Sequence, residues 1–277
     1  MTTIRLGTNV DRKKIDAVGG LAINQESHAR ENEGIDIEED DSAFEGRYVE
    51  RLFEIENRIC NLTRITKIII CVDPSAGGEN DTAAVCLAII DGLLVILWVD
   101  YIPRNKGPEF LAFVKTTIWK CSHHFRKGNY AIPIAVAIEA NGRLDGDFVE
   151  TSILTDNDKE FTNVLIIGEP SRGSETKGVN LLGKRKSEFI LHFSLNLDAN
   201  RIRLFEGVGT SNPKRMKTVL ETLKMQLLKF RRSDKSAKKG KFNDDAALAL
   251  LMAVFWIYHF YSHMDYALQR VKLTFVE

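Results

Sequence analysis

The chain has 277 residues, of which 44% are hydrophobic and 27% are charged, as in an ordinary globular protein with enough material for a large core. The formal net charge is zero, so overall charge indicates no class of partner. We expect no membrane span and no signal peptide, because no apolar stretch is long and uncharged enough. The four cysteines lack C-x-x-C spacing, which disfavours a zinc cluster and predicts a reducing, intracellular setting.

Charge is distributed unevenly along the chain. Residues 1–60 contain 14 acidic side chains against 8 basic ones, whereas residues 168–241 contain 7 acidic side chains against 18 basic ones. A basic segment of this size predicts a surface that faces a polyanion.

The hydrophobic pattern divides the chain into an N-terminal segment, residues 1–62, and a single main domain, residues 63–277. The first part is irregular except for an amphipathic helix predicted over 46–60. In the main domain, β-branched runs predict strands and a period of 3.6 residues predicts helices. In chain order these are strands 68–73, 83–91 and 93–102, helix 107–125, strand 134–139, helix 145–155, strand 163–167, helix 187–197, strand 202–205, and helices 213–230 and 244–261.

The order of these elements predicts a mixed sheet. Asp91-Gly92 is typical of a hairpin turn, so the first three strands are expected to be antiparallel. Alternating helices and strands follow, which favours parallel pairing with helices on both faces of the sheet. This is the ribonuclease H-like arrangement of an α/β fold, in which the first and fourth strands lie side by side.

Acidic residues occupy matching positions at the ends of these elements. Asp73 ends the first strand, Glu139 ends the fourth, and Asp244 and Asp245 begin the last helix. If strands one and four are parallel neighbours, the carboxylates meet at one edge of the sheet. Clustered carboxylates repel one another unless a divalent cation lies between them. Two Mg²⁺ or Mn²⁺ ions about 4 Å apart could then activate a water and stabilise the leaving oxygen of a phosphodiester.

Each of these acids also has an ordinary structural interpretation. Asp73 precedes Pro74 and Ser75 and could form an Asx turn, and an aspartate before an apolar run is typical of a helix N-cap. Asp81 is a candidate outer-shell carboxylate, or it could cap the second strand.

Three stretches, VDPSAGGENDTA, AIEANG and NDDAALALLMA, resemble the acidic motifs in the nuclease domain of viral DNA-packaging terminases. The large terminase subunits of tailed phages and herpesviruses carry this domain after an ATPase motor. The resemblance covers roughly Lys67 to Tyr261 and rests on short motifs. It implies that Asp73, Glu139 and one or both of Asp244 and Asp245 bind two divalent cations and cut double-stranded DNA.

The resemblance also implies roles and partners. Asp73 would bridge both ions, Glu139 would hold the second ion and orient the attacking water, and Asp245 or Asp244 would complete the shell of the first. The substrate would be concatemeric viral DNA, cut during genome packaging. The implied partners are an ATPase domain of the same full-length chain, the small terminase subunit and the portal. The implied location is the host nucleus for a herpesvirus-like protein or the host cytoplasm for a phage-like one.

Two basic segments are candidates for contacts with DNA phosphates. One segment begins a helix near the acidic edge, and the other directly precedes Asp244. Neither contains interleaved aromatic residues, which favours duplex over single-stranded DNA, although ordinary solvated surface is the alternative. The candidate residues are Lys184, Arg185, Lys186, Arg231, Arg232, Lys238, Lys239 and Lys241.

Residues 178–184 match the first seven positions of a phosphate-binding P-loop, but Arg185 stands where Ser or Thr would hold Mg²⁺, so we expect no ATP site. Two other functions stay open at this stage. The same acids would serve a Holliday-junction resolvase or a transposase-type enzyme, and the chain could also be an inactive scaffold that binds DNA.

Overall fold

The computed structural model describes residues 42–274, apart from residue 63 and residues 75–80, 103–107, 140–144, 172–173, 180–183, 211–212 and 233–243. The fold described below is that of the unit beginning at Ser42.

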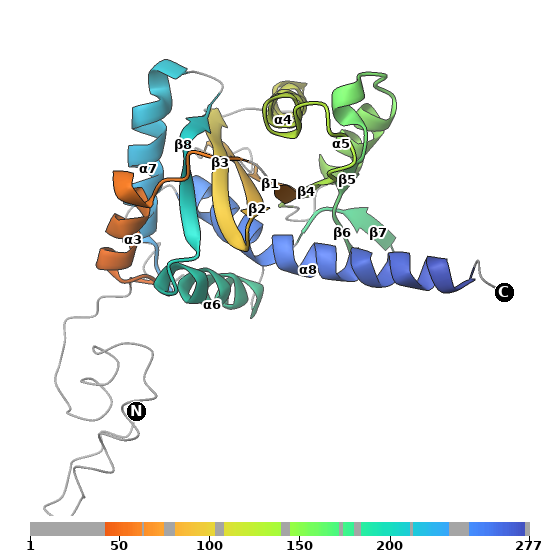
Figure 1. Cartoon of the computed structure of the whole chain (residues 1–277). Coiled ribbons are helices and arrows are strands. Elements are labelled where there is room, and N and C mark those ends of the chain that lie inside the picture. The colour runs from red at the N-terminus through yellow and green to blue at the C-terminus, as the bar shows by residue number, and fades with distance from the viewer. Residues whose placement is uncertain are drawn as a thin grey trace, which may run out of the picture. The chain divides into compact units, whose positions relative to one another are not determined.

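A six-stranded mixed sheet, in the order β5-β4-β1-β2-β3-β8, forms the centre of this unit (Figure 1). The antiparallel meander consists of β1 (Ile65–Asp73), β2 (Thr82–Ile90) and β3 (Leu93–Ile102). Parallel pairing adds β4 (Ile134–Ile138), β5 (Val164–Ile166) and β8 (Ile202–Gly209). The predicted mixed sheet, with its first and fourth strands side by side, is confirmed.

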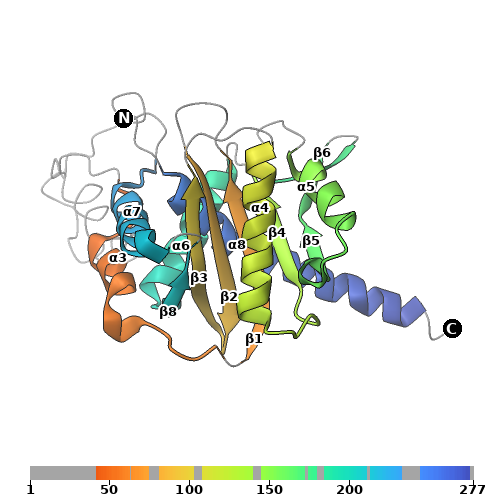
Figure 2. The same cartoon turned by 90° about the horizontal axis from the view of Figure 1, so that it is seen from above.

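The strands are buried on both faces, because helices cover the sheet from both sides (Figures 1 and 2). One face packs against α4 (Pro108–Cys121) and α5 (Asp145–Leu154). The other packs against α3 (Gly46–Phe53), α6 (Lys184–Asp198), α7 (Met216–Lys229) and α8 (Asp245–Thr274). Figure 2 shows α4 in front of the strands and α8 behind them.

Alternation along β1 assigns each side chain to a face. Ile68, Ile70 and Val72 belong to the core on the α4 side, whereas Ile69 and Cys71 belong to the core on the α8 side. Because the side-chain period of a strand is two, the next residue on the α8 side is the last of the strand, an aspartate.

Helix α8 is buried in its first half because residues 246–257 are apolar on every side. It continues to Thr274, beyond the end predicted at residue 261, as the long helix in Figure 1 shows. None of the helices in the described ranges has the apolar length needed to span a membrane.

Several boundaries differ from the prediction for physical reasons. The helix predicted over 46–60 ends at Phe53, because Ile59 pairs with β8 through backbone hydrogen bonds of 2.8 Å to Leu204 and 2.9 Å from Glu206. The stretch between the predicted strand 163–167 and the predicted helix 187–197, to which no element was assigned, contains the hairpin β6 (Gly168–Ser171) and β7 (Ser174–Lys177). Its strands lack hydrophobic alternation, so the sequence pattern did not reveal them.

Remaining differences lie at helix ends. The predicted helix 107–125 is α4 followed by a π-helical turn over Ser122–Arg126, and the helix predicted to begin at Ser187 begins at Lys184. The helix predicted over 213–230 begins with a 3₁₀ turn, Pro213–Arg215, before α7. A second 3₁₀ turn, Ile55–Asn57, follows α3, and a third, Lys159–Phe161, precedes β5.

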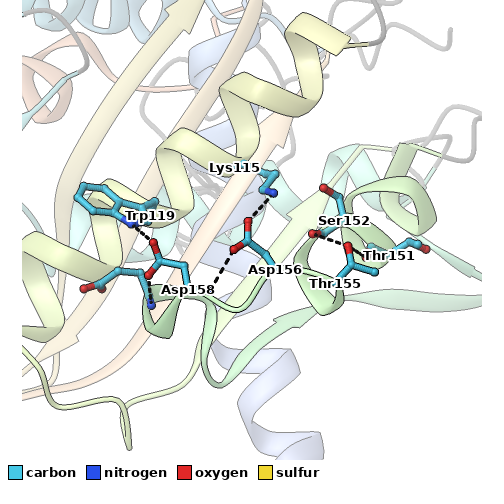
Figure 3. A network of polar contacts seen from close by, with 8 residues as sticks. Lys115, Trp119, Thr151, Ser152, Thr155, Asp156 and Asp158 are labelled. Atoms are coloured by element: carbon cyan, nitrogen blue, oxygen red, sulfur yellow. Dashed lines mark hydrogen bonds and ion pairs between the residues drawn. The ribbon is translucent and has the colours of Figure 1, made fainter.

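Polar contacts attach α4 to the loop between α5 and β5. Lys115 Nζ lies 2.7 Å from Asp156 Oδ2, and Trp119 Nε1 donates to Asp158 Oδ2 at 2.8 Å (Figure 3). At the end of α4, the buried Arg126 guanidinium donates to the carbonyl oxygens of Thr162 at 2.7 Å and Asn163 at 3.0 Å. A buried charge that is hydrogen-bonded in this way fixes the loop that leads into the parallel half of the sheet.

Replacing Arg126 with Met is expected to lower the free energy of unfolding by about 3 kcal/mol, because buried carbonyl oxygens lose their donors. Urea denaturation followed by circular dichroism measures this difference. Arg47→Met is the matched control, since Arg47 is exposed and its side chain hydrogen-bonds to the neighbouring Glu45 and Tyr48. Equal stability of the two variants would contradict the role of Arg126.

Candidate active site

The pairing of β1 with β4 places two acids next to each other at one edge of the sheet. Val72 is opposite Ile138 in the parallel register, and the Glu139 N–H donates to the Val72 carbonyl oxygen at 2.9 Å. Asp73 and Glu139, the next residue of each segment, therefore lie side by side at the ends of β1 and β4. Both side chains lie on the face that packs against α8, because both continue the alternation of core residues on that face.

Helix α8 begins over the same edge. Asp244 occupies its N-cap position, where the Asp244 carbonyl oxygen accepts the Leu248 N–H at 2.8 Å. Asp245 is the first helical residue and is only 6% exposed, whereas Asp244 is half-buried. The sequence did not distinguish Asp244 from Asp245, but their different burial does.

The structure brings all four predicted acids into electrostatic contact. Burial of the Asp73 carboxyl, which is 5% exposed, raises its pKa well above the ordinary value. A hydrogen bond with the Glu139 side chain and the negative charge of Glu139 raise this pKa further, and so do the charges of Asp245 and Asp244. Such a set of buried acids is costly to the fold and is typical of a functional site.

The carboxylate oxygens of this cluster are suitable ligands for a hard cation, but in the described arrangement they do not form a coordination site. Asp and Glu oxygens are the ligands that Mg²⁺ and Mn²⁺ prefer. Within the described ranges, however, no three His, Cys, Asp or Glu side chains form a group that could hold a metal ion. The raised pKa of Asp73 favours the protonated carboxyl in the cation-free protein, so binding of a cation would be accompanied by loss of this proton.

A cavity of about 450 Å³ opens beside Asp245. Asp81 lines it from the position just before β2 and Tyr101 from β3, and Glu221 and Gln226 line it from α7. Asp81 therefore shares a cavity with one of the clustered acids, although its role as an outer-shell carboxylate stays a prediction.

Sequence reasoning missed the contribution of α7 to this site. The Gln226 side chain is 5% exposed, and its Oε1 accepts the Ala247 N–H at 3.0 Å. It thereby satisfies one of the first-turn N–H groups of α8 that have no partner within the helix. The available signal was a glutamine within an apolar stripe, next to Leu223 and Leu227 at helical spacing.

The basic candidates are not all placed by the structure. Arg185 and Lys186, at the start of α6, hold their charges 5.6 Å from the rings of Trp256 and Phe230. Arg231 and Arg232 are exposed, just after α7. The side chain of Lys184 and the whole of Lys238, Lys239 and Lys241 lie outside the described part of the chain.

The P-loop-like segment takes part in the sheet edge at its first two positions. Gly178 pairs with Gly168, and Val179 pairs with Glu139 and donates its N–H to the Ile138 carbonyl oxygen at 2.8 Å. Residues 180–183 of this motif fall among those that are not described. The expectation that no ATP binds here therefore stays a prediction.

Solved structures with a similar fold are nuclease domains of the human cytomegalovirus terminase. The inhibitor-bound, Mn-soaked domain matches with a TM-score of 0.62 and 13% identity, over 78% of this chain and 95% of that one. The Mn-soaked domain without inhibitor matches with a TM-score of 0.60 and 14% identity, over 77% of this chain and 94% of that one. The chain has the fold of a viral terminase nuclease domain. The predicted ribonuclease H-like α/β fold is confirmed.

A third structure of the cytomegalovirus domain gives a TM-score of 0.58 and 14% identity, over 77% of this chain and 94% of that one. No protein-family model matches the sequence, and no curated protein is significantly similar to it. At this level of identity, the terminase nuclease fold is shared while most side chains differ.

Replacing Asp73 with Asn is expected to stabilise the cation-free protein by about 1–2 kcal/mol at pH 8, because one buried charge is removed from the cluster. The folded-state pKa of Asp73 is raised, so the favourable contribution of its proton is fully present below the unfolded pKa. It is lost as the pH rises toward the folded pKa. The advantage of the variant should therefore grow from pH 5 to pH 8.

Urea denaturation in EDTA at both pH values measures this effect. Asp91→Asn is the control, because Asp91 is exposed in the β2–β3 turn, with a positive φ that asparagine tolerates. An Asp73→Asn protein less stable than wild type at pH 8 would contradict the repulsion argument.

Replacing Gln226 with Leu is expected to lower the free energy of unfolding by about 1–2 kcal/mol, because the buried Ala247 N–H loses its acceptor. Gln226→Glu keeps an acceptor oxygen and should retain more of the stability. Met225→Leu, at an exposed neighbouring position on α7, is the control for substitution of this helix. Thermal denaturation of the three variants measures these differences. Similar melting temperatures for all three would contradict a stabilising hydrogen bond from the Ala247 N–H to Gln226.

Proposed function

We propose that this chain is an endonuclease that hydrolyses phosphodiester bonds of double-stranded viral DNA during genome packaging, with two divalent cations, Mg²⁺ or Mn²⁺. The observation that supports this most strongly is the meeting of Asp73, Glu139, Asp244 and Asp245 at one sheet edge. A buried cluster of acids with hard oxygen donors suits a divalent cation better than it suits any covalent nucleophile.

The similarity to the cytomegalovirus domain supports the same proposal. That protein is described as a terminase nuclease domain, and two of its structures are of Mn-soaked crystals. The match with this chain covers 95% of the cytomegalovirus domain. Transfer of both properties to this chain is a proposal that rests on the shared fold and on the position of the acids.

The roles of the acids follow from their surroundings. When bound, the cations would activate a water and stabilise the leaving oxygen of the phosphodiester. Asp73 is our candidate for a ligand of both cations, because the charges of Glu139, Asp245 and Asp244 all act on it. Glu139 would hold the second cation and orient the attacking water.

Asp245 is the better candidate of the two helix aspartates. It is more deeply buried than Asp244 and lines the cavity beside the cluster. The Asp244 backbone, in contrast, starts the helix through its hydrogen bond with Leu248. We therefore assign Asp245 to the first cation and Asp244 to a supporting position beside it.

We further propose that basic side chains near the acids bind the phosphates of duplex DNA. Arg231 and Arg232 are the exposed described members of this set, and Lys184, Arg185, Lys186, Lys238, Lys239 and Lys241 complete it. The terminase context would bring an ATPase domain of the same full-length protein, a small terminase subunit and a portal, and would place the chain inside the host cell.

An inactive DNA-binding scaffold is the second candidate. The observation in its favour is that, in the described arrangement, the acids form no ready group of three for a metal. Nuclease activity would require Asp73 to lose its proton to a cation, whereas a scaffold would keep the carboxyl protonated.

Cleavage of supercoiled plasmid in Mn²⁺ distinguishes these functions. Wild type is expected to cut, Asp73→Asn to be slower by about 100-fold or more, and Asp245→Asn to lose more activity than Asp244→Asn. Asp91→Asn serves as the control and should cut at the wild-type rate. Persistence of cleavage in Asp73→Asn would refute the proposed chemistry. DNA binding without cutting in any divalent cation would favour the scaffold.

A further inference from the structure

A second cavity, of about 500 Å³, lies on the opposite face of the sheet from the acids. It is bounded by the end of α4, by β3 and by β8, and its ring-bearing walls are Trp98, Phe125 and Phe205. Trp98 and Phe125 belong to the core on the α4 side, whereas the acids face α8. Trp98 is level with Cys86 and Ile70, three residues before Asp73 on β1. The nuclease site and this cavity are therefore separated by the sheet.

Two lysines lie in the described lining of this cavity, Lys120 and Lys127, together with the imidazole of His124 and no acidic side chain. A buried carboxylate lies behind the lining, where Asp100 accepts a hydrogen bond from Thr210 at 3.2 Å. Neither the two lysines nor His124 form an ion pair with any residue that the structure describes. The Lys120 ammonium instead lies 5.9 Å from the centre of the Trp98 ring. Two lysines that line one cavity and form no ion pair with the described residues favour an anionic ligand.

The Trp98 side chain supplies a second and independent indication of a ligand. Trp98 is 4% exposed, and its buried Nε1 has no hydrogen-bond partner among the described residues. A buried indole N–H without an acceptor is costly, and most are satisfied.

The indole packs closely on β8. A Cβ on Gly209 would lie only 1.9 Å from Trp98 Cε3, so the ring edge opposite to Nε1 lies against the β8 backbone. Glycine at this position permits that approach and holds the indole in place. An acceptor must therefore come from elsewhere.

The cavity also offers flat surfaces. The rings of Trp98 and His124 are nearly parallel, with an interplanar angle of 18° and centroids 6.2 Å apart. His124 is exposed and can rotate, while Phe125 is buried beside it. Parallel rings next to cations are suited to a planar aromatic group that carries negative charge.

We propose that this cavity binds an aromatic anion of about the size of a nucleoside monophosphate. The ring of the ligand packs against the exposed His124 ring at the edge of Trp98, and its anionic group is held by Lys120 and Lys127. An acceptor atom of the ligand receives the Trp98 N–H. The volume is within the range of small-molecule sites. This site does not depend on the nuclease chemistry proposed above.

Titration of the full chain with dTMP in EDTA tests the proposal by calorimetry. We expect a dissociation constant of about 10–300 µM, with thymidine and inorganic phosphate each weaker by about tenfold or more. Phenyl phosphate should also bind, because it keeps both the ring and the anion. Equal binding of thymidine, equal binding of phosphate, or no binding of either aromatic anion would overturn the proposal.

Matched variants locate the binding site. Lys120→Gln is expected to weaken dTMP binding about five- to tenfold, whereas Lys159→Gln, at an exposed position after α5, should leave it unchanged. Asp73→Asn should bind dTMP as wild type does. Loss of binding in Asp73→Asn would assign the ligand to the acidic cluster and refute a separate site.

Indole NMR signals give a readout that a loss of folding would not mimic. The chain has three tryptophans, and the Trp119 Nε1 already donates to Asp158. The Trp98 Nε1–H signal, assigned from its disappearance in Trp98→Phe, should shift downfield with dTMP and not with thymidine. A Trp98 signal that does not respond to bound dTMP would exclude this cavity.

Discussion

The parallel pairing of β1 with β4 is the constraint on which the acidic site depends. It sets Val72 opposite Ile138, so that the next residue of each strand is an acid on the same face of the sheet. The two carboxyls meet where the strands end, partly excluded from water, and burial raises the pKa of Asp73. Without this register the two acids would be unrelated surface residues.

The cost of gathering buried acids is offset by the rigidity of the elements that carry them. Both strands are central in the sheet and lie under helices on both faces. Helix α8 is anchored by a fully apolar first half, and Gln226 of α7 binds the N–H of Ala247 in its first turn. Asp245 is therefore held at the edge by packing and by a polar contact that it does not itself make.

The sheet separates two chemically opposite regions. The α8 face ends in the acidic cluster, whereas the α4 face holds a cavity lined by cations and aromatic rings near Trp98. The alternation of side chains along β1 and β3 produces this division, because successive residues point to opposite faces. A chain with no net charge therefore carries local charge of both signs where a ligand could use it.

The sequence by itself determined the order of helices and strands along the chain and that Asp73 and Glu139 come at the ends of their strands. These features follow from apolar runs whose ends are marked by a single acid, which is local information. That the first and fourth strands are neighbours was expected only from the ribonuclease H-like arrangement. Tertiary structure decided which aspartate of the pair is buried, that Gln226 caps α8, and that β6 and β7 form a hairpin. It also decided that Trp98 rests on Gly209 above a basic cavity. These features depend on contacts between residues far apart in the chain, and hydrophobic periodicity carries no record of such contacts.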